Sequence, residues 1–318
     1  MKLLYPPRLH PGDTLGVVAP ASAPPDPKNV DRAIAVLERL GYRTKLAPKV
    51  HQRLGFLAGS DRDRAGDLMR MFTDRKVQAI ICVRGGYGTA RLLSRLDYPL
   101  IRANPKIFIG YSDITSLHGA FLTRAGLVSF HGPMLNSDFA LKRLPAFTVQ
   151  SFLRTLTSPA PPGDIATGYA GRTVKILRRG IARGRLIGGN ITILNTLIGT
   201  RWLPDFKNTI LFLEDVGEVP YRWDRMLTQL LNCGLLPQVA GVAIGLNARC
   251  QDPRAQTAGE YRQTLEEVFC ERLRPLNIPV VAGLPFGHVA MNATLPVGAR
   301  ATLDANRGEL RLDEAGVR

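Results

Sequence analysis

The sequence has no long apolar run and few cysteines. In its 318 residues, no stretch approaches the roughly 20 apolar residues that a membrane-spanning helix needs. The first residues contain no apolar run long enough for a secretory signal. The four cysteines lie far apart without Cys-x-x-Cys spacing, which argues against a zinc site and a disulfide framework. We therefore expect a cytoplasmic protein with reduced thiols, no membrane partner and no bound metal.

Acidic residues are scarce relative to basic ones. Lys and Arg number 42 against 26 Asp and Glu, which gives a net charge of +16. Such a charge attracts nucleic acid, anionic lipid or an acidic small molecule. The densest basic run, residues 172–185, lacks the interleaved aromatic side chains of a groove that binds single strands. We therefore expect no nucleic-acid partner, and a basic nucleic-acid-binding protein without enzymatic activity remains an alternative.

The first half of the chain alternates strand and helix patterns. Apolar runs of β-forming residues at 14–19, 77–83, 107–110 and 127–130 predict strands. Apolar residues at helical spacing between 30 and 40 predict a helix that ends before Gly41. Ser60, with an acid three residues later, predicts the start of another helix. This alternation is typical of a doubly wound parallel sheet in an α/β domain.

Proline and glycine interrupt this alternation at residues 158–164. We therefore expect an N-terminal α/β domain over 1–157, a linker over 158–184 and a second domain over 185–318. In the second domain, one helix is expected after residue 190 and a β-hairpin near the end of the chain. Apolar strands are expected at 209–213, 239–244 and 278–282, and hairpin strands at 299–303 and 309–312. The second domain is thus expected to be mixed α/β with an antiparallel element.

Residues 106–118 read as an apolar strand that turns abruptly at Ser112 and continues as a helix. Such a turn holds a hydroxyl at the carboxyl edge of a sheet. It also leaves free N–H groups at the start of the helix, where developing negative charge is stabilised. A serine nucleophile needs this geometry, together with a base that is itself oriented by an acceptor, usually a carboxylate.

Only five histidines are available as the base. His10 and His51 lie in polar segments and are expected at the surface. His118 follows the serine on the same predicted helix and is turned away from it by about 240°. His131 and His288 both follow apolar strands, at the edge where α/β sites form. For His131, a structural hydrogen-bonding role is favoured. The residues alone nevertheless do not decide whether His131 or His288 is the base.

Two adjacent acids, Glu214 and Asp215, end the predicted strand 209–213. A buried acid is costly unless it is paired or solvated. Because strand side chains alternate, the two acids point to opposite sides, and the sequence does not choose between them. A tetrahedral intermediate also needs N–H donors: Asp113 supplies one, and the glycine-rich turn 84–89 is a candidate for the second. This turn matches neither the dinucleotide-binding nor the P-loop pattern, so no nucleotide cofactor is expected.

Several short motifs resemble the LD-carboxypeptidase family of serine peptidases, which includes muropeptide tetrapeptidases and microcin C immunity peptidases. The similarity runs from about Gly12 to Val297 and rests on the number and order of the motifs. These motifs are Gly12-Asp13-Thr14, Ala19-Pro20-Ala21-Ser22, Arg84-Gly85-Gly86-Tyr87-Gly88, Gly110-Tyr111-Ser112-Asp113, His131-Gly132-Pro133-Met134, Gly188-Gly189-Asn190, Leu213-Glu214-Asp215, Pro220-Tyr221-Arg222-Trp223-Asp224-Arg225 and Gly283-Leu284-Pro285-Phe286-Gly287-His288.

The resemblance implies a catalytic triad carried here by Ser112, Glu214 and His288. It also implies an oxyanion hole formed by the backbone N–H groups of Gly86 and Asp113. The implied fold pairs an N-terminal domain similar to class I glutamine amidotransferases with a C-terminal swivelling β/β/α domain. The site would then lie between the two domains.

The activity implied by the resemblance is hydrolysis of the bond between an L-centre and a terminal D-amino acid. This would release D-alanine from murein tetrapeptides during peptidoglycan recycling, without a cofactor. The expected partners are a small peptide substrate and, as a homodimer, a second copy of the chain. Side chains suited to substrate binding are Arg84, Tyr87, Tyr111, Arg222 and Arg225.

The alternative within the same family is an immunity-type peptidase. It would cleave the amide that joins an aminoacyl or peptidyl group to a nucleotide. An aromatic residue that stacks on the base would favour this alternative, and Trp223 is the candidate for such a residue.

Overall fold

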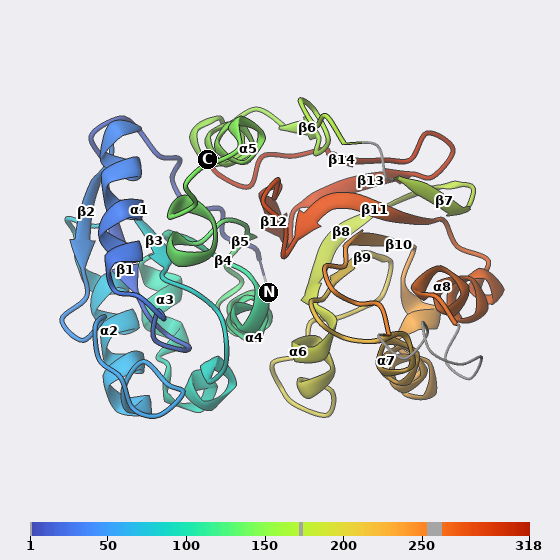
Figure 1. Ribbon diagram of the computed structural model, residues 1–318, viewed down its shortest axis with the longest axis horizontal. Helices are drawn as coiled ribbons and strands as arrows, with labels where there is room; N and C mark the ends of the chain where they lie inside the picture. The colour runs from blue at the N-terminus through green and yellow to red at the C-terminus, as the bar shows by residue number, and fades with distance from the viewer. Residues whose placement is uncertain (1, 172–173, 253–262) are drawn as a thin grey trace.

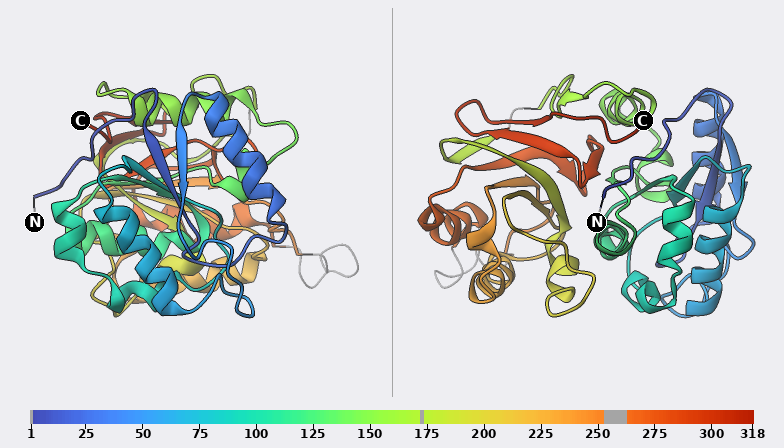
Figure 2. Two further views of the ribbon diagram at one scale, coloured as in Figure 1. Left: turned by 90° about the vertical axis from the view of Figure 1, so that its left-hand side faces the viewer. Right: turned by 180° about the vertical axis from the view of Figure 1, so that it is seen from behind.

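A computed structural model describes residues 2–171, 174–252 and 263–318 of the chain. Two β-sheets, each packed against helices, form two α/β units that lie side by side (Figure 1). The view from behind shows the same separation, with the first unit in blue and cyan and most of the second in yellow to red (Figure 2). Arg172, at the start of the basic run, lies outside the described residues.

The first unit contains five strands, five helices and several short helical turns. These elements are β1 (Thr14–Val18), α1 (Lys28–Arg39), β2 (Arg43–Leu46), α2 (Asp61–Thr73), β3 (Ala79–Cys82), η1 (Thr89–Arg95), α3 (Tyr98–Ala103), β4 (Ile107–Gly110), η2 (Ser112–Ile114), α4 (Thr115–Ala120), η3 (Phe121–Ala125), β5 (Ser129–His131), η4 (Leu135–Phe139) and α5 (Ala146–Thr157). As predicted, Ser60 caps α2 by accepting a hydrogen bond from the N–H of Asp63, and Gly41 follows α1 with a φ of 89°.

The sheet of the first unit has the strand order β12-β5-β4-β3-β1-β2. Strands β1 to β5 pair in parallel, which confirms the parallel α/β sheet predicted from the sequence. The exception is β12 (Leu295–Val297), which runs antiparallel to β5 and comes from a late part of the chain.

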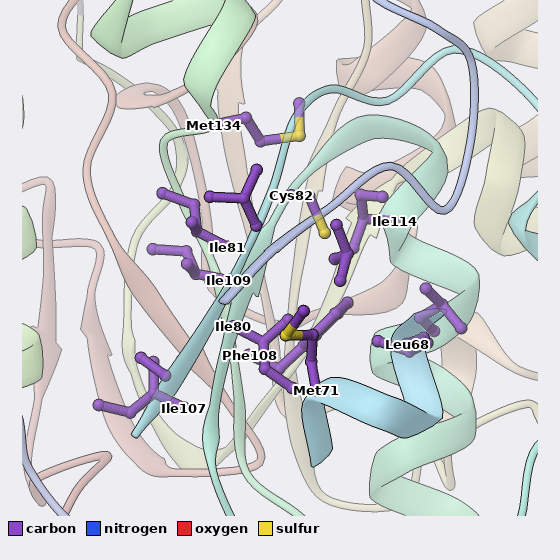
Figure 3. Close-up of a cluster of buried hydrophobic side chains, with 14 of the residues drawn as sticks. Leu68, Met71, Ile80, Ile81, Cys82, Ile107, Phe108, Ile109, Ile114 and Met134 are labelled. Carbon is purple, nitrogen blue, oxygen red and sulfur yellow. The ribbon is translucent and has the colours of Figure 1, made fainter. Parts of the chain in front are cut away.

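The two central strands of this sheet, β3 and β4, are buried along their whole length. Their side chains alternate between the two faces (Figure 3). Ile80 and Phe108 are register partners and lie on the side of Met71, while Ile81 and Ile109 lie on the other side. Apolar contacts on both faces therefore fix the end of β4, from which the chain enters the turn at residue 112.

The second unit is built on an eight-stranded sheet with the order β6-β14-β13-β8-β9-β10-β11-β7. Strands β8 to β11 are parallel and the outer strands are antiparallel. Its elements are β6 (Gly163–Asp164), β7 (Lys175–Arg178), β8 (Ile181–Asn190), α6 (Ile191–Thr196), β9 (Thr209–Glu214), α7 (Pro220–Asn232), η5 (Leu236–Gln238), β10 (Gly241–Leu246), α8 (Leu265–Leu273), η8 (Arg274–Leu276), β11 (Val280–Gly287), β13 (Arg300–Asp304) and β14 (Glu309–Leu312). The predicted terminal hairpin is present as β13 and β14.

The two faces of this second sheet belong to different cores. Leu211 and Leu213 of β9 pack in a cluster with residues of α7 and α8. Ile210 and Phe212, which alternate with them, pack in a second cluster that includes Phe286 and Leu295. In Figure 1, helices α6, α7 and α8 lie below the sheet, on one side of it. Each position along β9 therefore points either toward these helices or toward the opposite core.

The expected linker 158–184 needs correction, because it contributes to the second sheet. Strands β6 and β7 and the first residues of β8 lie within it. Strand β6 pairs with β14 and β7 pairs with β11, so both occupy sheet edges. Proline and glycine are tolerated at such edges, where one side of the strand needs no ladder partner. The Pro-rich composition therefore does not exclude strand pairing.

The chain also crosses between the units more than once. Besides β12, the last residues return to the first unit: the N–H of Arg318 donates to Pro6 O, and the N–H of Arg8 donates to Arg318 O. Val317 packs in the core of the first unit. Across the described ranges, no helix has the length and apolar character needed to span a membrane.

Candidate active site

Ser112 lies at the abrupt turn between β4 and the helix that follows. Strand β4 ends at Gly110, Tyr111 is extended, and Ser112 has a φ of 65° before the chain enters η2 and α4. A positive φ at a non-glycine residue is strained, and such residues cluster at functional sites. The strand–serine–helix turn predicted from the sequence is therefore present, with a half-buried serine at its apex.

A glutamate–histidine pair comes from the second unit. Glu214 is the last residue of β9 and is fully buried. Its Oε2 lies 2.6 Å from Nδ1 of His288, which directly follows β11. The preceding Gly287 has a φ of 117°, and a Cβ there would lie 3.0 Å from Glu214 Oε2. A glycine is therefore needed for the close approach of the two side chains.

Burial and charge act in opposite directions on this pair. Burial lowers the pKa of His288, but the charge of Glu214 and its hydrogen bond outweigh burial and raise the pKa. Burial likewise raises the pKa of Glu214, but the charge of His288 and the shared hydrogen bond lower it overall. The pair therefore favours a carboxylate that stabilises an imidazolium.

Tyr111 connects the serine turn to this pair. Its ring lies edge-on to the His288 ring, with 4.9 Å between the centroids. The residue next to Ser112 thus touches the histidine of the other unit. Within the described part of the chain, no hydrogen bond joins the Ser112 hydroxyl to His288. Catalytic hydrogen bonds are often long without substrate and tighten when it binds. The lack of a hydrogen bond between Ser112 and His288 in the free protein is therefore compatible with a triad.

The glycine-rich turn after β3 lies directly against Ser112. A Cβ on Gly85 would lie 2.8 Å from Ser112 Cβ and 3.2 Å from the backbone N of Asp113. The Asp113 carboxylate accepts a hydrogen bond from the N–H of Thr89 at 2.8 Å, which ties the two turns together. Among the described residues, the N–H groups of Gly86 and Asp113 donate no hydrogen bond. The Asp113 N–H therefore lies beside the serine, and the Gly86 N–H lies one residue after the glycine that packs against it.

Asp215 points the opposite way from Glu214, as strand alternation predicts. It accepts hydrogen bonds from Asn190 Nδ2 at 2.9 Å and from Thr192 Oγ1 at 2.7 Å. Asn190 in turn donates its backbone N–H to Thr115 Oγ1 of the first unit at 3.0 Å. The acid therefore stabilises the start of α6 and the contact between the units.

Asn190 and Thr115 are site-supporting residues that reasoning from single residues missed. A Cβ on Gly189 would lie 2.5 Å from Thr115 Oγ1, so the glycine permits a close approach between the two units. The only signal in the sequence was the Gly188-Gly189-Asn190 motif, which was noted for the family resemblance without a physical role.

His131 differs from its prediction as a structural hydrogen bonder. The side chain is completely buried, and within the described residues neither ring nitrogen has a hydrogen-bond partner. It packs edge-on against Phe212, with 5.2 Å between centroids, and also contacts Tyr111 and Phe286. Burial lowers the pKa of His131 to about 4, so its ring is neutral near pH 7. The prediction failed because β5 points this side chain into an aromatic layer between the units.

The other histidines lie as the sequence predicts. His10 and His51 are exposed. His118 is buried, and its ring nitrogens contact Ser129 Oγ and Gly110 O, each at 2.8 Å. His118 therefore stabilises the end of β4 through its contact with the carbonyl O of Gly110.

The aromatic candidates for substrate binding occupy different environments. Tyr111 is buried and packs on His288. Tyr87 is half exposed on the glycine-rich turn, where its ring packs edge-on against Phe56. Trp223, the candidate stacking residue, is fully buried and packs on Phe269. Trp223 is therefore a core residue of α7 and has no free face for a base.

The arginine candidates also differ. Arg84 is partly buried, with its guanidinium close to Gly86. Arg222 and Arg225 are exposed on α7, and both lie over the ring of Tyr221. Arg222 also forms an ion pair with an acid one turn earlier in the chain. Of the three, only Arg84 belongs to the glycine-rich turn, two residues before Gly86.

No cluster of three or more His, Cys, Asp or Glu side chains that could hold a metal ion occurs in residues 2–171, 174–252 and 263–318. The four cysteines are free thiols, as expected from their spacing. The groups that the structure brings together at the site are a hydroxyl, an imidazole, a carboxylate and backbone N–H groups.

A strained serine on one α/β unit and a buried glutamate–histidine pair on the other are the components of a serine-hydrolase site. Models of the LD-carboxypeptidase N-terminal domain and the LD-carboxypeptidase C-terminal domain match residues 15–132 and 183–303. These matches cover more than half of the chain. The chain therefore belongs to the LD-carboxypeptidase family.

Relatives match nearly the whole chain. A putative carboxypeptidase of Synechocystis sp. is 42% identical, over 96% of this chain and 96% of the relative. A probable murein peptide carboxypeptidase of Bacillus subtilis is 38% identical, over 99% of this chain and 96% of the relative.

Solved structures share the two-unit arrangement. That of the muramoyltetrapeptide carboxypeptidase from Oxalobacter formigenes is 36% identical with a TM-score of 0.81, and the match covers 95% of this chain and 98% of that one. The microcin C7 self-immunity protein MccF superposes with a TM-score of 0.88 at 25% identity, over 99% of this chain and 100% of that one. The two-domain α/β architecture is therefore that of the family.

Proposed function

We propose that this protein is a cytoplasmic serine carboxypeptidase that releases the terminal D-alanine of murein tetrapeptides. The observation that carries the proposal is the Glu214–His288 pair, joined at 2.6 Å, beside the strained turn at Ser112. The proposed substrate is a small peptide, and the site requires no nucleic acid and no cofactor. The matched murein peptide carboxypeptidases support this choice of substrate.

In the proposed mechanism, Nε2 of His288 takes the proton from the Ser112 hydroxyl as its oxygen attacks the scissile carbonyl. Glu214 holds Nδ1 protonated and stabilises the imidazolium that forms. His288 then gives its proton to the departing amine of D-alanine. Water attacks the acyl-enzyme with His288 again acting as the base, and Ser112 recovers its proton.

The negative charge that develops on the carbonyl oxygen needs donors that are already in place. The free N–H groups of Gly86 and Asp113 lie on the two turns that meet at the serine. Loss of one such donor costs roughly 10²–10³-fold in kcat, or about 3–4 kcal/mol. Arg84, beside Gly86, is the proposed contact for a carboxylate of the peptide on the acyl side of the bond.

The alternative function is hydrolysis of an aminoacyl- or peptidyl-nucleotide amide, supported by the likeness to the microcin C7 self-immunity protein. This alternative function needs an exposed aromatic side chain on which the nucleobase can stack. Trp223, its candidate, is completely buried. The murein peptide reading is therefore favoured.

The proposal is tested by incubating the protein with L-Ala-γ-D-Glu-meso-diaminopimelate-D-Ala and following tripeptide and D-alanine by mass spectrometry. The wild type is expected to release D-alanine. Ser112→Ala is expected to abolish release, whereas Ser94→Ala, at an exposed serine of η1, is the matched control. An active Ser112→Ala variant contradicts the mechanism. Turnover of an aspartyl-nucleotide analogue without turnover of the tetrapeptide moves the assignment to the alternative.

A further inference from the structure

A small pocket of about 250 Å³ opens beside His288. Its walls come from both units, with Tyr111, Ser137 and Leu141 on one side and Arg249, His288, Val289 and Ala290 on the other. This volume is below the usual 300–1,000 Å³ of pockets for larger ligands, so it suits one small residue better than a nucleoside. Apart from His288, the ionisable groups that line it are Arg249 and the buried phenol of Tyr111.

The backbone of Arg249 is held in a strained conformation. Its φ is 57°, in the left-handed region that residues other than glycine rarely adopt. Such strain persists where the surrounding structure imposes it, and it is concentrated at ligand-binding positions. The exposed side chain of Arg249 makes no hydrogen bond or ion pair within the described residues. Its five N–H donors are therefore available to a ligand.

The loop that carries Arg249 is fixed on both sides to the segment after Glu214. Ala248 bridges to Val216, and its carbonyl accepts the N–H of Gly217 at 2.9 Å. Cys250 is buried, and its thiol lies 3.7 Å from the carbonyl O of Asp215. Arg249 is therefore positioned relative to the acid of the glutamate–histidine pair, and the cost of ordering its backbone is already met in the free protein.

The position of the pocket identifies the part of the substrate that it would hold. In the proposed mechanism, His288 protonates the leaving amine, so the leaving residue lies on the His288 side of Ser112. The carboxylate of a C-terminal D-amino acid is one carbon away from that amine. A guanidinium binds a carboxylate through two parallel hydrogen bonds. The apolar side chains of Leu141 and Val289 suit the methyl group of alanine.

We propose that Arg249 binds the terminal carboxylate of the leaving D-amino acid and so restricts hydrolysis to the last residue of the peptide. The inference rests on the proposed function, because it assigns a residue to the substrate of that reaction. Arg222 and Arg225, which the sequence offered with Arg84 as candidates for substrate binding, fit this role less well: Arg222 is paired and lies over Tyr221, and Arg225 lies over the same ring.

The test compares two substrates that differ only at the group Arg249 would bind. These are the murein tetrapeptide with a free C-terminal carboxylate and the same peptide ending in D-alaninamide. The wild type is expected to prefer the free acid in kcat/KM. Arg249→Gln is expected to lower kcat/KM for the acid by roughly 10- to 100-fold, mainly through KM, because a charge-assisted hydrogen bond is lost. Its kcat/KM for the amide is expected to stay within about twofold.

Two further variants distinguish the loss of carboxylate binding by Arg249 from a general disturbance of the protein structure. Arg249→Lys keeps the charge without the planar fork and should recover part of the preference for the acid. Arg307→Gln, at an exposed arginine of the terminal hairpin, should leave both substrates unaffected. Equal loss on acid and amide, or an unchanged preference in Arg249→Gln, overturns the assignment of Arg249. If the wild type turns over neither peptide, the proposed function itself fails, and the inference that depends on it fails as well.

Discussion

Replacing Glu214 by Gln tests the central pair with little change in shape. In the wild type, the charge and hydrogen bond of Glu214 raise the pKa of His288 against the effect of burial. His131, which is fully buried and has no hydrogen-bond partner in the described residues, shows the direction in which burial acts, since burial is the main reason why its pKa is lowered to about 4. In Glu214→Gln, the pKa of His288 is therefore expected to fall below its ordinary value.

The same change removes the group that fixes the tautomer of His288. The Gln amide can donate to Nδ1, which places the proton on Nε2, the atom that must accept the serine proton. We expect kcat to fall by roughly 10⁴-fold, or about 5 kcal/mol of transition-state stabilisation. The protein itself should be destabilised most at low pH, where an imidazolium would be buried without its counter-charge.

The assay is D-alanine release measured as kcat/KM against pH. Only neutral His288 can accept the serine proton, so wild-type activity should fall as pH drops through the raised pKa of His288. In Glu214→Gln the residual activity should persist to lower pH. Asp215→Asn is the comparison variant, because this neighbouring acid bonds to Asn190 and Thr192 and raises the pKa of His288 less than Glu214 does. A Glu214→Gln variant with kcat within tenfold of wild type and an unshifted acid limb refutes the reasoning.

Two further predictions concern the turn at the serine and a buried acid behind the site. Gly85→Ala places a Cβ 2.8 Å from Ser112 Cβ. Because this displaces the serine, kcat should fall by roughly 10²-fold, while the midpoint of thermal unfolding should shift only modestly. An unchanged kcat would show that the turn can move aside without disturbing the serine. Burial raises the pKa of Asp138 to about 7, against an ordinary value of 3.8. The neutral form of Asp138 therefore stabilises the fold fully below pH 4, and this contribution is lost as the pH rises toward 7. Asp138→Asn removes the effect, so the free energy of unfolding of the wild type relative to this variant should drop between pH 4 and 8 by up to about 4 kcal/mol. Urea unfolding at several pH values measures it, and parallel pH curves for the two proteins would contradict the burial argument.

Local patterns were sufficient for much of the fold. The buried runs around Ile80 and Phe108 predicted strands because β-forming apolar residues fill both faces of a parallel sheet. The cap at Ser60 was predictable because its hydrogen bond spans three residues. Strands β2, β6, β7 and β12 were not predicted, because each is a short strand at the edge of a sheet. The longer strand β8 was not predicted either, because its arginines and glycines interrupt the apolar pattern.

The site was predictable up to the choices that depend on packing. The sequence determined the turn at Ser112 and, through strand alternation, that Glu214 and Asp215 point to opposite sides. The tertiary structure decided which side meets the first domain: Phe212 packs toward the core opposite the helices, and Glu214, two residues later, follows it. It likewise placed His288 against Glu214 and enclosed His131 among aromatic rings. Such choices depend on how two sheets face each other, which is a property of long-range packing that no local pattern in the chain encodes.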